Sequence, residues 1–208
     1  MAALCLHAIT LLDGGHPEDT AVAEGARAIH YRDLCAVVTE RPTFAVTEAG
    51  PNEIGAHRAL VDRLFRSMAV LPAPVGVVFR ADEVLTRWME LHYVAISDAL
   101  AFVEDRVAAR VHAARKGGDV DAKEAGADLA SAATEAFRAL RRRAVATVPL
   151  RLENVTGLML SGAFLVEREL WKEFLAAVDE QRDAPHLLRF DVTGPWAPYD
   201  FVQLQFDA

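Results

Sequence analysis

Histidines and cysteines are the side chains of this 208-residue sequence best suited to bind a metal or a cofactor. The seven histidines are scattered over different predicted elements: His7, His16, His30, His57, His92, His112 and His186. A metal site would therefore need several distant segments to converge. Cys5 and Cys35 lie in apolar, strand-like runs, where a free thiol behaves as a small hydrophobic side chain. The sequence predicts no metal, no cofactor and no disulfide framework.

Two groups of charged residues could perform acid–base catalysis or bind an anion. Glu167 and Glu169 flank Arg168, but residues two apart do not face each other on a helix, so we interpret them as solvated residues of a first turn. Arg138 and Arg141 to Arg143 could bind an anionic ligand, although basic residues at a helix end also complement the helix dipole. The sequence has no nucleophile elbow, phosphate loop, His-Glu-x-x-His or dinucleotide motif. An enzyme is the least favoured class.

Charge and hydropathy argue against two kinds of partner. With 30 acidic and 22 basic residues, the chain has a net charge of −8, which repels nucleic-acid phosphates and anionic lipid surfaces. No apolar run approaches the ~20 residues that span a bilayer, and no basic region precedes the apolar N-terminal stretch. The sequence predicts a cytoplasmic protein without nucleic-acid or lipid-membrane partners.

The first half of the chain has the predicted order β-β-β-α-β-α. A polar loop to Glu24 follows the first strand, and only Arg32-Asp33 separates the next two strands, which predicts a hairpin. Apolar residues spaced by three, four and seven predict a helix from Asn52 to Ala69. Ala81-Asp82 opens a longer helix that reaches residue 103, with Ala95 on its apolar side. The predicted strands are 4–12, 26–31, 34–39 and 75–79.

The second half has the predicted order β-α-β-β-α-β, which is the ferredoxin-like order. Pro149 confines its strand to a sheet edge because proline has no amide hydrogen to donate. The run 157–166 is apolar on both faces, as a central strand should be. The remaining strands are predicted at 107–112, 144–152 and 187–193, and the helices at 121–142 and 170–178, after a linker at 115–119.

These patterns predict an α+β fold of two small modules linked by a long helix. Residues 1–103 form a β-rich α+β module, and residues 104–208 form a ferredoxin-like module with an aromatic C-terminal tail. A chain with 52% hydrophobic residues can supply both cores. The helix-free side of strand 157–166 needs a cover, either the first module or another chain.

The tail, residues 192–202, is predicted to be a docking segment. Gly194-Pro195 is expected to stop the preceding strand. Prolines then hold three aromatic side chains on a stiff path, so little conformational freedom is lost on docking. The candidate docking residues are Trp196, Pro198, Tyr199 and Phe201. They could dock on their own chain as a plug, with Trp196→Ala clearly lowering the melting temperature, or they could contact another protein.

The ending Gly194-Pro-Trp-Ala-Pro-Tyr-Asp-Phe-Val202 resembles the Gly-Pro-Trp-Pro-Pro-Tyr-Ser-Phe-Val signature of the gas vesicle accessory proteins called GvpL/GvpF. The resemblance also includes Gly162-Ala-Phe-Leu-Val166 and the stretch from Leu71-Pro72 to Phe79. Ala197 and Asp200 depart from that signature. So do Pro74 and Val75, which stand where arginine and phenylalanine are expected.

The resemblance implies a non-enzymatic accessory protein that acts in gas vesicle assembly. It implies that the protein binds the small hydrophobic shell protein, and possibly other gas vesicle accessory proteins, and that it associates with gas vesicles in the cytoplasm. The alternative is a small-ligand-binding or dimerising ferredoxin-like module, because that fold hosts many functions.

Overall fold

The computed structural model describes residues 3–12, 16–23, 25–42, 44, 49–116, 125–151, 157–184, 187–202 and 204. Two compact units make up the chain: Met1–Glu104 with Ala197–Ala208 is unit 1, and Asp105–Trp196 is unit 2. The main division lies one residue from the expected one. The tail differs, because Ala197–Ala208 groups with unit 1 and not with the second half of the chain. Val202 and Leu204 account for this, since both pack against the unit 1 core.

Unit 1 contains a five-stranded antiparallel sheet. Its order is β2-β3-β1-β4, and β5 also pairs with β1. Tyr31 pairs with Leu34, which confirms the hairpin predicted around Arg32-Asp33. The strands are β1 (Ala3–Leu11), β2 (Arg27–Tyr31), β3 (Leu34–Arg41), β4 (Val70–Pro72) and β5 (Val78–Phe79).

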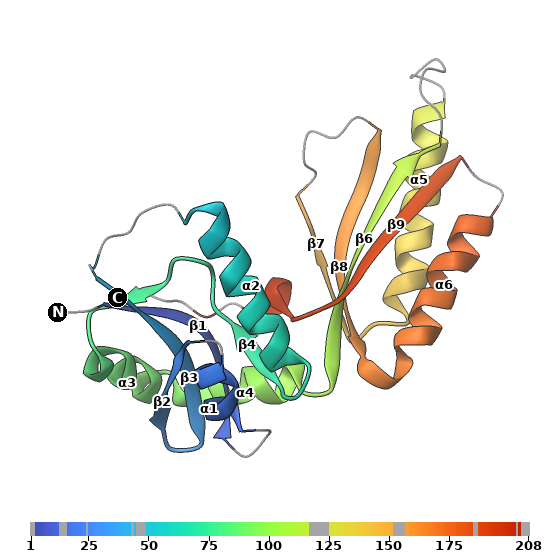
Figure 1. The fold of residues 1–208 in the computed structure, drawn as a ribbon. Helices are drawn as coiled ribbons and strands as arrows, with labels where there is room; N and C mark the ends of the chain where they lie inside the picture. Colours follow the sequence, from blue (N-terminus) through green and yellow to red (C-terminus); the bar gives the residue numbers. More distant parts are fainter. Residues whose placement is uncertain are drawn as a thin grey trace. The chain divides into compact units, whose positions relative to one another are not determined.

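Helices lie on both sides of this sheet, with α2 on one side and α3 and α4 on the other (Figure 1). The core against α3 and α4 includes Leu6, Phe79 and Trp88. Most β1 side chains are buried, as expected for a strand covered on both faces. The helices are α1 (Pro17–Ala23), α2 (Pro51–Phe65), α3 (Asp82–Leu91) and α4 (Tyr93–Val103).

The prediction of one long helix between the modules is wrong in one respect, because the helix breaks at His92. The backbone of His92 leaves helical geometry (φ −107°, ψ 11°), and its Nδ1 lies 2.8 Å from the Trp88 carbonyl oxygen, which its backbone N–H also approaches. Ala95 is exposed, whereas Ile96 and Leu100 are buried at the helical spacing that Leu85 and Met89 already set, so the break at His92 keeps the buried face in register. Both helices belong to unit 1.

Two short elements of unit 1 were missed, and one helix is shorter than predicted. Helix α1 occupies part of the expected polar loop. Helix α2 ends at Phe65, so the expected continuation to Ala69 is wrong. Strand β4 follows, pairing with β1 where only a helix stop was expected. Such short pieces carry too few residues to show a periodicity.

Unit 2 contains a four-stranded antiparallel sheet with the order β7-β8-β6-β9. β8 lies between β6 and β7, which confirms the interior position predicted for residues 157–166. Pro149 lies in the edge strand β7, as predicted. The strands are β6 (Arg106–Arg115), β7 (Ala146–Pro149), β8 (Leu158–Glu167) and β9 (Leu188–Trp196). Residues 117–119 of the expected linker, residues 121–124 of the expected helix and Leu152 lie outside the described residues.

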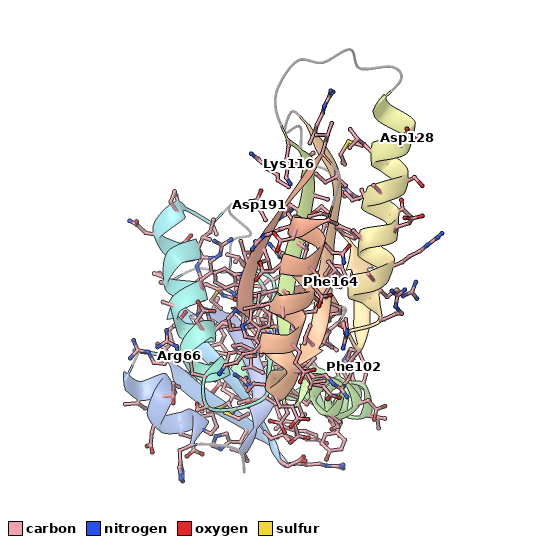
Figure 2. All side chains as sticks on the ribbon, turned by 90° about the vertical axis from the view of Figure 1, so that its right-hand side faces the viewer. Arg66, Phe102, Lys116, Asp128, Phe164 and Asp191 are labelled. Carbon is pink, nitrogen blue, oxygen red and sulfur yellow. The ribbon has the colours of Figure 1, made fainter. Side chains whose placement is uncertain are left out.

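Helices α5 (Ala125–Arg141) and α6 (Trp171–Asp183) lie side by side on one face of this sheet (Figure 1). The turn η2 (Arg168–Leu170) leads into α6. Phe164 of β8 is fully buried and packs against Phe137 of α5 and Phe174 of α6, at centroid distances of 5.5 Å in both pairs. Figure 2 labels Phe164, and it labels Asp128 in the first turn of α5. This aromatic contact is the centre of the unit 2 core.

The expectation that Gly194-Pro195 stops the last strand is wrong. β9 continues to Trp196, which pairs with Ala108 of β6. The register shifts between Ala108 and Arg110, and Gly194 takes a φ of 136°, which favours glycine. Pro195 follows a cis peptide bond. Proline is tolerated there because β9 is an edge strand, where a missing donor interrupts no inner ladder.

Candidate functional site

The aromatic tail predicted as a docking segment is divided between the two units. Trp196 is the last residue of β9; its side chain is 43% exposed, and its indole Nε1 donates a hydrogen bond to Thr193 Oγ1 at 3.2 Å. Pro198, Tyr199 and Phe201 belong to unit 1. Trp196 is therefore described with unit 2, and the other three predicted residues are described with unit 1.

Within unit 1 the tail is docked through buried and half-buried side chains. Ala197 and Pro198 are buried, and Tyr199 and Phe201 are half-buried in the turn η3 (Tyr199–Phe201). The Tyr199 N–H donates to the Ala197 carbonyl at 2.8 Å, and the Phe201 N–H donates to the Pro198 carbonyl at 3.0 Å. Trp196 is the most exposed of the four predicted tail residues.

A pair of buried histidines lies beneath Tyr199. His7 of β1 and His57 of α2 place their Nδ1 atoms 3.0 Å apart, and His7 Nε2 lies 2.9 Å from Thr39 Oγ1 of β3. His57 is 1% exposed, and its ring centroid is 6.3 Å from that of Tyr199. Neither His57 Nε2 nor the Tyr199 hydroxyl has a hydrogen-bond partner among the described residues. A tail segment and two distant elements thus converge on one polar cluster.

Burial controls the proton affinity of this cluster. Loss of hydration and, to a smaller extent, the neighbouring His57 lower the pKa of His7 to about 4. Burial likewise lowers the pKa of His57, against the opposing effect of the Ala73 carbonyl. Burial raises the pKa of Tyr199, and Asp62 adds to that rise. Both histidines are therefore neutral at pH 7.

The sequence contained one signal that could have found this pair. His57 lies three residues after Ile54, four before Val61 and seven before Leu64, so the helical period places it on the buried face of α2. A polar residue there needs a partner. Its partner, however, comes from a strand fifty residues away, and only the fold could identify it.

Of the other candidate residues from the sequence, the structure brings Arg142 and Arg143 together with Glu167. Cys5 and Cys35 are free thiols in β1 and β3, and burial raises the pKa of both. Glu167 ends β8, whereas Glu169 is exposed in η2. Arg138 and Arg141 lie in the last turn of α5. Arg142 and Arg143 line a shallow pocket of about 270 Å³ together with Glu167, Glu173 and Phe174.

The face of the unit 2 sheet opposite α5 and α6 carries a second candidate site. Side chains alternate along β8, so Ser161 lies on the face opposite Phe164. Its Oγ lies 2.8 Å from His112 Nδ1. On β9, Arg189 Nε lies 3.4 Å from Asp191 Oδ2, and Figure 2 labels Asp191. These residues line a pocket of about 660 Å³ with Arg110, Ala114, Leu150, Arg151 and Leu158.

The described residues lack two further features. They contain no group of three or more histidine, cysteine, aspartate or glutamate side chains placed to hold a metal ion. They also contain no helix that is both long enough and apolar enough to cross a bilayer.

Sequence comparison identifies relatives along nearly the whole chain. The family model of gas vesicle synthesis protein GvpL/GvpF matches residues 7–124 and 108–203. Gas vesicle protein F2 of Halobacterium salinarum is 26% identical over 197 residues, which cover 92% of this chain and 86% of the relative. Gas vesicle protein F of Haloferax mediterranei is 24% identical over 195 residues, which cover 92% and 88%.

The fold is similar to two crystal structures of gas vesicle protein GvpF. The protein from Anabaena has a TM-score of 0.79 at 16% identity, with 99% of this chain and 98% of that chain covered. The protein from Microcystis aeruginosa has a TM-score of 0.74 at 14% identity, with 98% and 100% covered. At such identities this likeness shows the mixed α+β fold alone. The family model does more: because it matches well over half of the sequence, the chain belongs to the gas vesicle synthesis protein GvpL/GvpF family.

Proposed function

We propose that this protein is a non-enzymatic accessory factor that acts in gas vesicle assembly by binding the small hydrophobic shell protein. Family membership carries the proposal, because it supports a gas vesicle accessory role. Other accessory proteins of the vesicle are further proposed partners. The protein would associate with gas vesicles in the cytoplasm, and its charge of −8 disfavours nucleic acid and lipid membranes as partners.

We place the shell contact on α3 and α4, at an apolar surface that we call the α4 surface (Leu91, Val94 and Phe102). Leu91 is 66% exposed and Val94 is 70% exposed, one on each side of the break at His92. Phe102 is also exposed, and Figure 2 shows it at α4. Asp98, one helical turn from both Val94 and Phe102, is exposed as well, so this surface is apolar with one acidic residue within it. A hydrophobic partner would bury the three apolar side chains, and the tail residue Trp196 is a second proposed contact.

Capture of the purified shell protein tests this placement. We expect the double variant Leu91→Asp/Val94→Asp to lose most of the binding, because a buried interface disfavours unpaired carboxylates. Val22→Asp on α1 is the matched control, since Val22 is 71% exposed but lies on another helix. Normal capture by the double variant would show that the contact does not lie on the α4 surface. Loss of capture by Trp196→Ala alone would place it on the tail.

A second candidate function is that of a small-ligand-binding or dimerising ferredoxin-like module. The element order β6-α5-β7-β8-α6-β9 and the strand order β7-β8-β6-β9 support the ferredoxin-like description of unit 2. The pocket of about 660 Å³ opposite its helices favours this function. We further propose that units 1 and 2 are separate folding domains. A dimer in light scattering that dissociates in Arg110→Glu would favour the second function over the first.

A further inference from the structure

We propose that residues 197–202 form a latch over a proton-sensitive histidine pair, so that acidification releases the tail from unit 1 while the unit 1 sheet stays folded. The latch consists of the buried Ala197 and Pro198 and of Tyr199, whose ring lies over His57. The histidine pair is His7 with His57. This inference is independent of the shell contact proposed above.

The geometry of the pair limits how many protons it can hold. A contact of 3.0 Å between His7 Nδ1 and His57 Nδ1 is a hydrogen bond only if one of the two nitrogens carries a proton. One additional proton, on the Nε2 of the ring whose Nδ1 donates, leaves that bond possible. A second additional proton turns both Nδ1 atoms into donors that face each other, and the bond is lost. The rings, whose centroids are 5.1 Å apart, would then both be charged.

The surroundings offer little compensation for this charge. His7 contacts the neutral hydroxyl of Thr39 on β3. His57 contacts the neutral backbone carbonyl of Ala73. On α2 the nearby Arg58 disfavours a charged His57, whereas the carboxylate Asp62 acts on Tyr199. The tail contributes only the neutral Tyr199 phenol. Burial therefore disfavours protonation of the two histidines. Access of water after release of the tail would remove this penalty.

The tail is the element that can yield. Helix α2 and β1 belong to the main body of unit 1, where α2 also buries Leu60, Val61 and Leu64. The backbone hydrogen bonds of Tyr199 and Phe201 stay within the tail, and segments with few buried contacts open at a lower free energy than a core does. The Tyr199 hydroxyl and His57 Nε2 are both buried without a hydrogen-bond partner in the described part of the chain, which costs stability in the docked state and is relieved by water on release.

Hydrogen exchange of the full-length protein tests the latch. We expect the Tyr199 and Phe201 amides to exchange on the order of tenfold faster at pH 5.0 than at pH 7.5, after correction for intrinsic exchange, because the histidines bind protons more readily when the tail is released. Amides of β1 and β3 should keep their exchange rates. An unchanged tail would overturn the proposal, and so would an equal increase in the tail and the sheet, since that is global unfolding.

A matched pair of histidine variants locates the sensor. His57→Gln should make tail exchange independent of pH, whereas His112→Gln in unit 2 should leave the response intact. A normal pH response in His57→Gln would contradict the latch. Should His57→Gln fail to fold, ring-proton NMR titration of the parent protein decides: the midpoint of the Tyr199 amide shift must coincide with the titration of His7 or His57, and any other midpoint overturns the assignment.

Discussion

The two sheets accommodate the polar side chains of their strands in different ways. The unit 1 sheet has helices on both sides, so a polar residue of β1 has no open face to occupy (Figure 1). Thr10 therefore donates to the Ala69 carbonyl at 2.7 Å, and His7 bonds to His57 and Thr39. The unit 2 sheet has α5 and α6 on one face, and its polar residues, such as Arg110 and His112, alternate onto the other.

Because of this difference, the stability of each unit depends on a different kind of interaction. In unit 1 a buried polar group depends on one specific partner, and removing that partner leaves an unsatisfied group at a cost of about 1–3 kcal/mol. In unit 2 the polar residues lie on a face without helices of their own unit, and stability depends on apolar packing under α5 and α6. Substitutions in both units, compared by their effect on the free energy of unfolding, test this contrast.

Phe164→Ala should have the largest effect. Phe164 is fully buried between α5 and α6, and truncating such a side chain costs about 3–5 kcal/mol. Because Phe164 belongs to unit 2, we expect only one of two unfolding transitions to move in calorimetry. Val94→Ala is the control, because Val94 is 70% exposed, and it should shift neither transition by more than about 1 kcal/mol. Equal shifts of both transitions by Phe164→Ala would show that the units fold as one.

Tyr199→Ala should come next and should exceed Trp196→Ala. Tyr199 packs on His57 inside unit 1, so its loss should cost roughly 2 kcal/mol, less than a fully buried aromatic would. Trp196 is 43% exposed, so its truncation should cost less than that of Tyr199, although the sequence predicted a clear loss of melting temperature for Trp196→Ala. Urea denaturation of both variants measures the order. A larger loss for Trp196→Ala would mean that the indole packs more tightly in solution.

The strand order of unit 2 was predictable because several independent signals agreed. Pro149 marked an edge strand, and the apolar run 157–166 marked a central one. The break at His92 was not predictable, since apolar residues continue on both sides of it. The extension of β9 through Pro195 was missed for a different reason. A strand tolerates proline when it lies at the edge of its sheet, and the position of a strand in the sheet depends on the whole fold.

The candidate site was less accessible from the sequence than the fold was. Trp196, Pro198, Tyr199 and Phe201 were recognised by composition, but their division between two units depends on the contacts of Val202 and Leu204. The histidine pair was missed because scattered residues were assumed to remain apart. Local spacing predicts which face a side chain occupies, whereas pairing of β1 with α2 is a long-range property.

Thr10→Val compares the buried polar groups of the two sheets directly. The valine keeps the shape but leaves the Ala69 carbonyl unsatisfied in unit 1, so we expect a loss of about 1–2 kcal/mol in urea denaturation. Ser161→Ala in unit 2 is the matched variant, and its partner His112 is only half-buried, so less than about 1 kcal/mol is expected. Equal losses would remove the contrast between the two sheets.

Asp82→Asn should have the smallest effect and should depend on pH and salt. The Arg27 guanidinium forms two hydrogen bonds to Asp82, at 2.8 and 2.6 Å, and lowers the pKa of its carboxyl. Both side chains are more than one-third exposed, so solvent screening limits the loss to less than about 1 kcal/mol. Because the folded-state pKa is lowered, the stabilisation is present above the ordinary carboxyl pKa and disappears as the pH falls through the lowered value. Wild type and variant should therefore differ in urea denaturation at pH 7, and should converge at pH 2 or in 1 M salt. A difference that persists in 1 M salt would mean that the pair is shielded from solvent, and unit 1 would then hold a charged group as tightly as it holds its buried histidines.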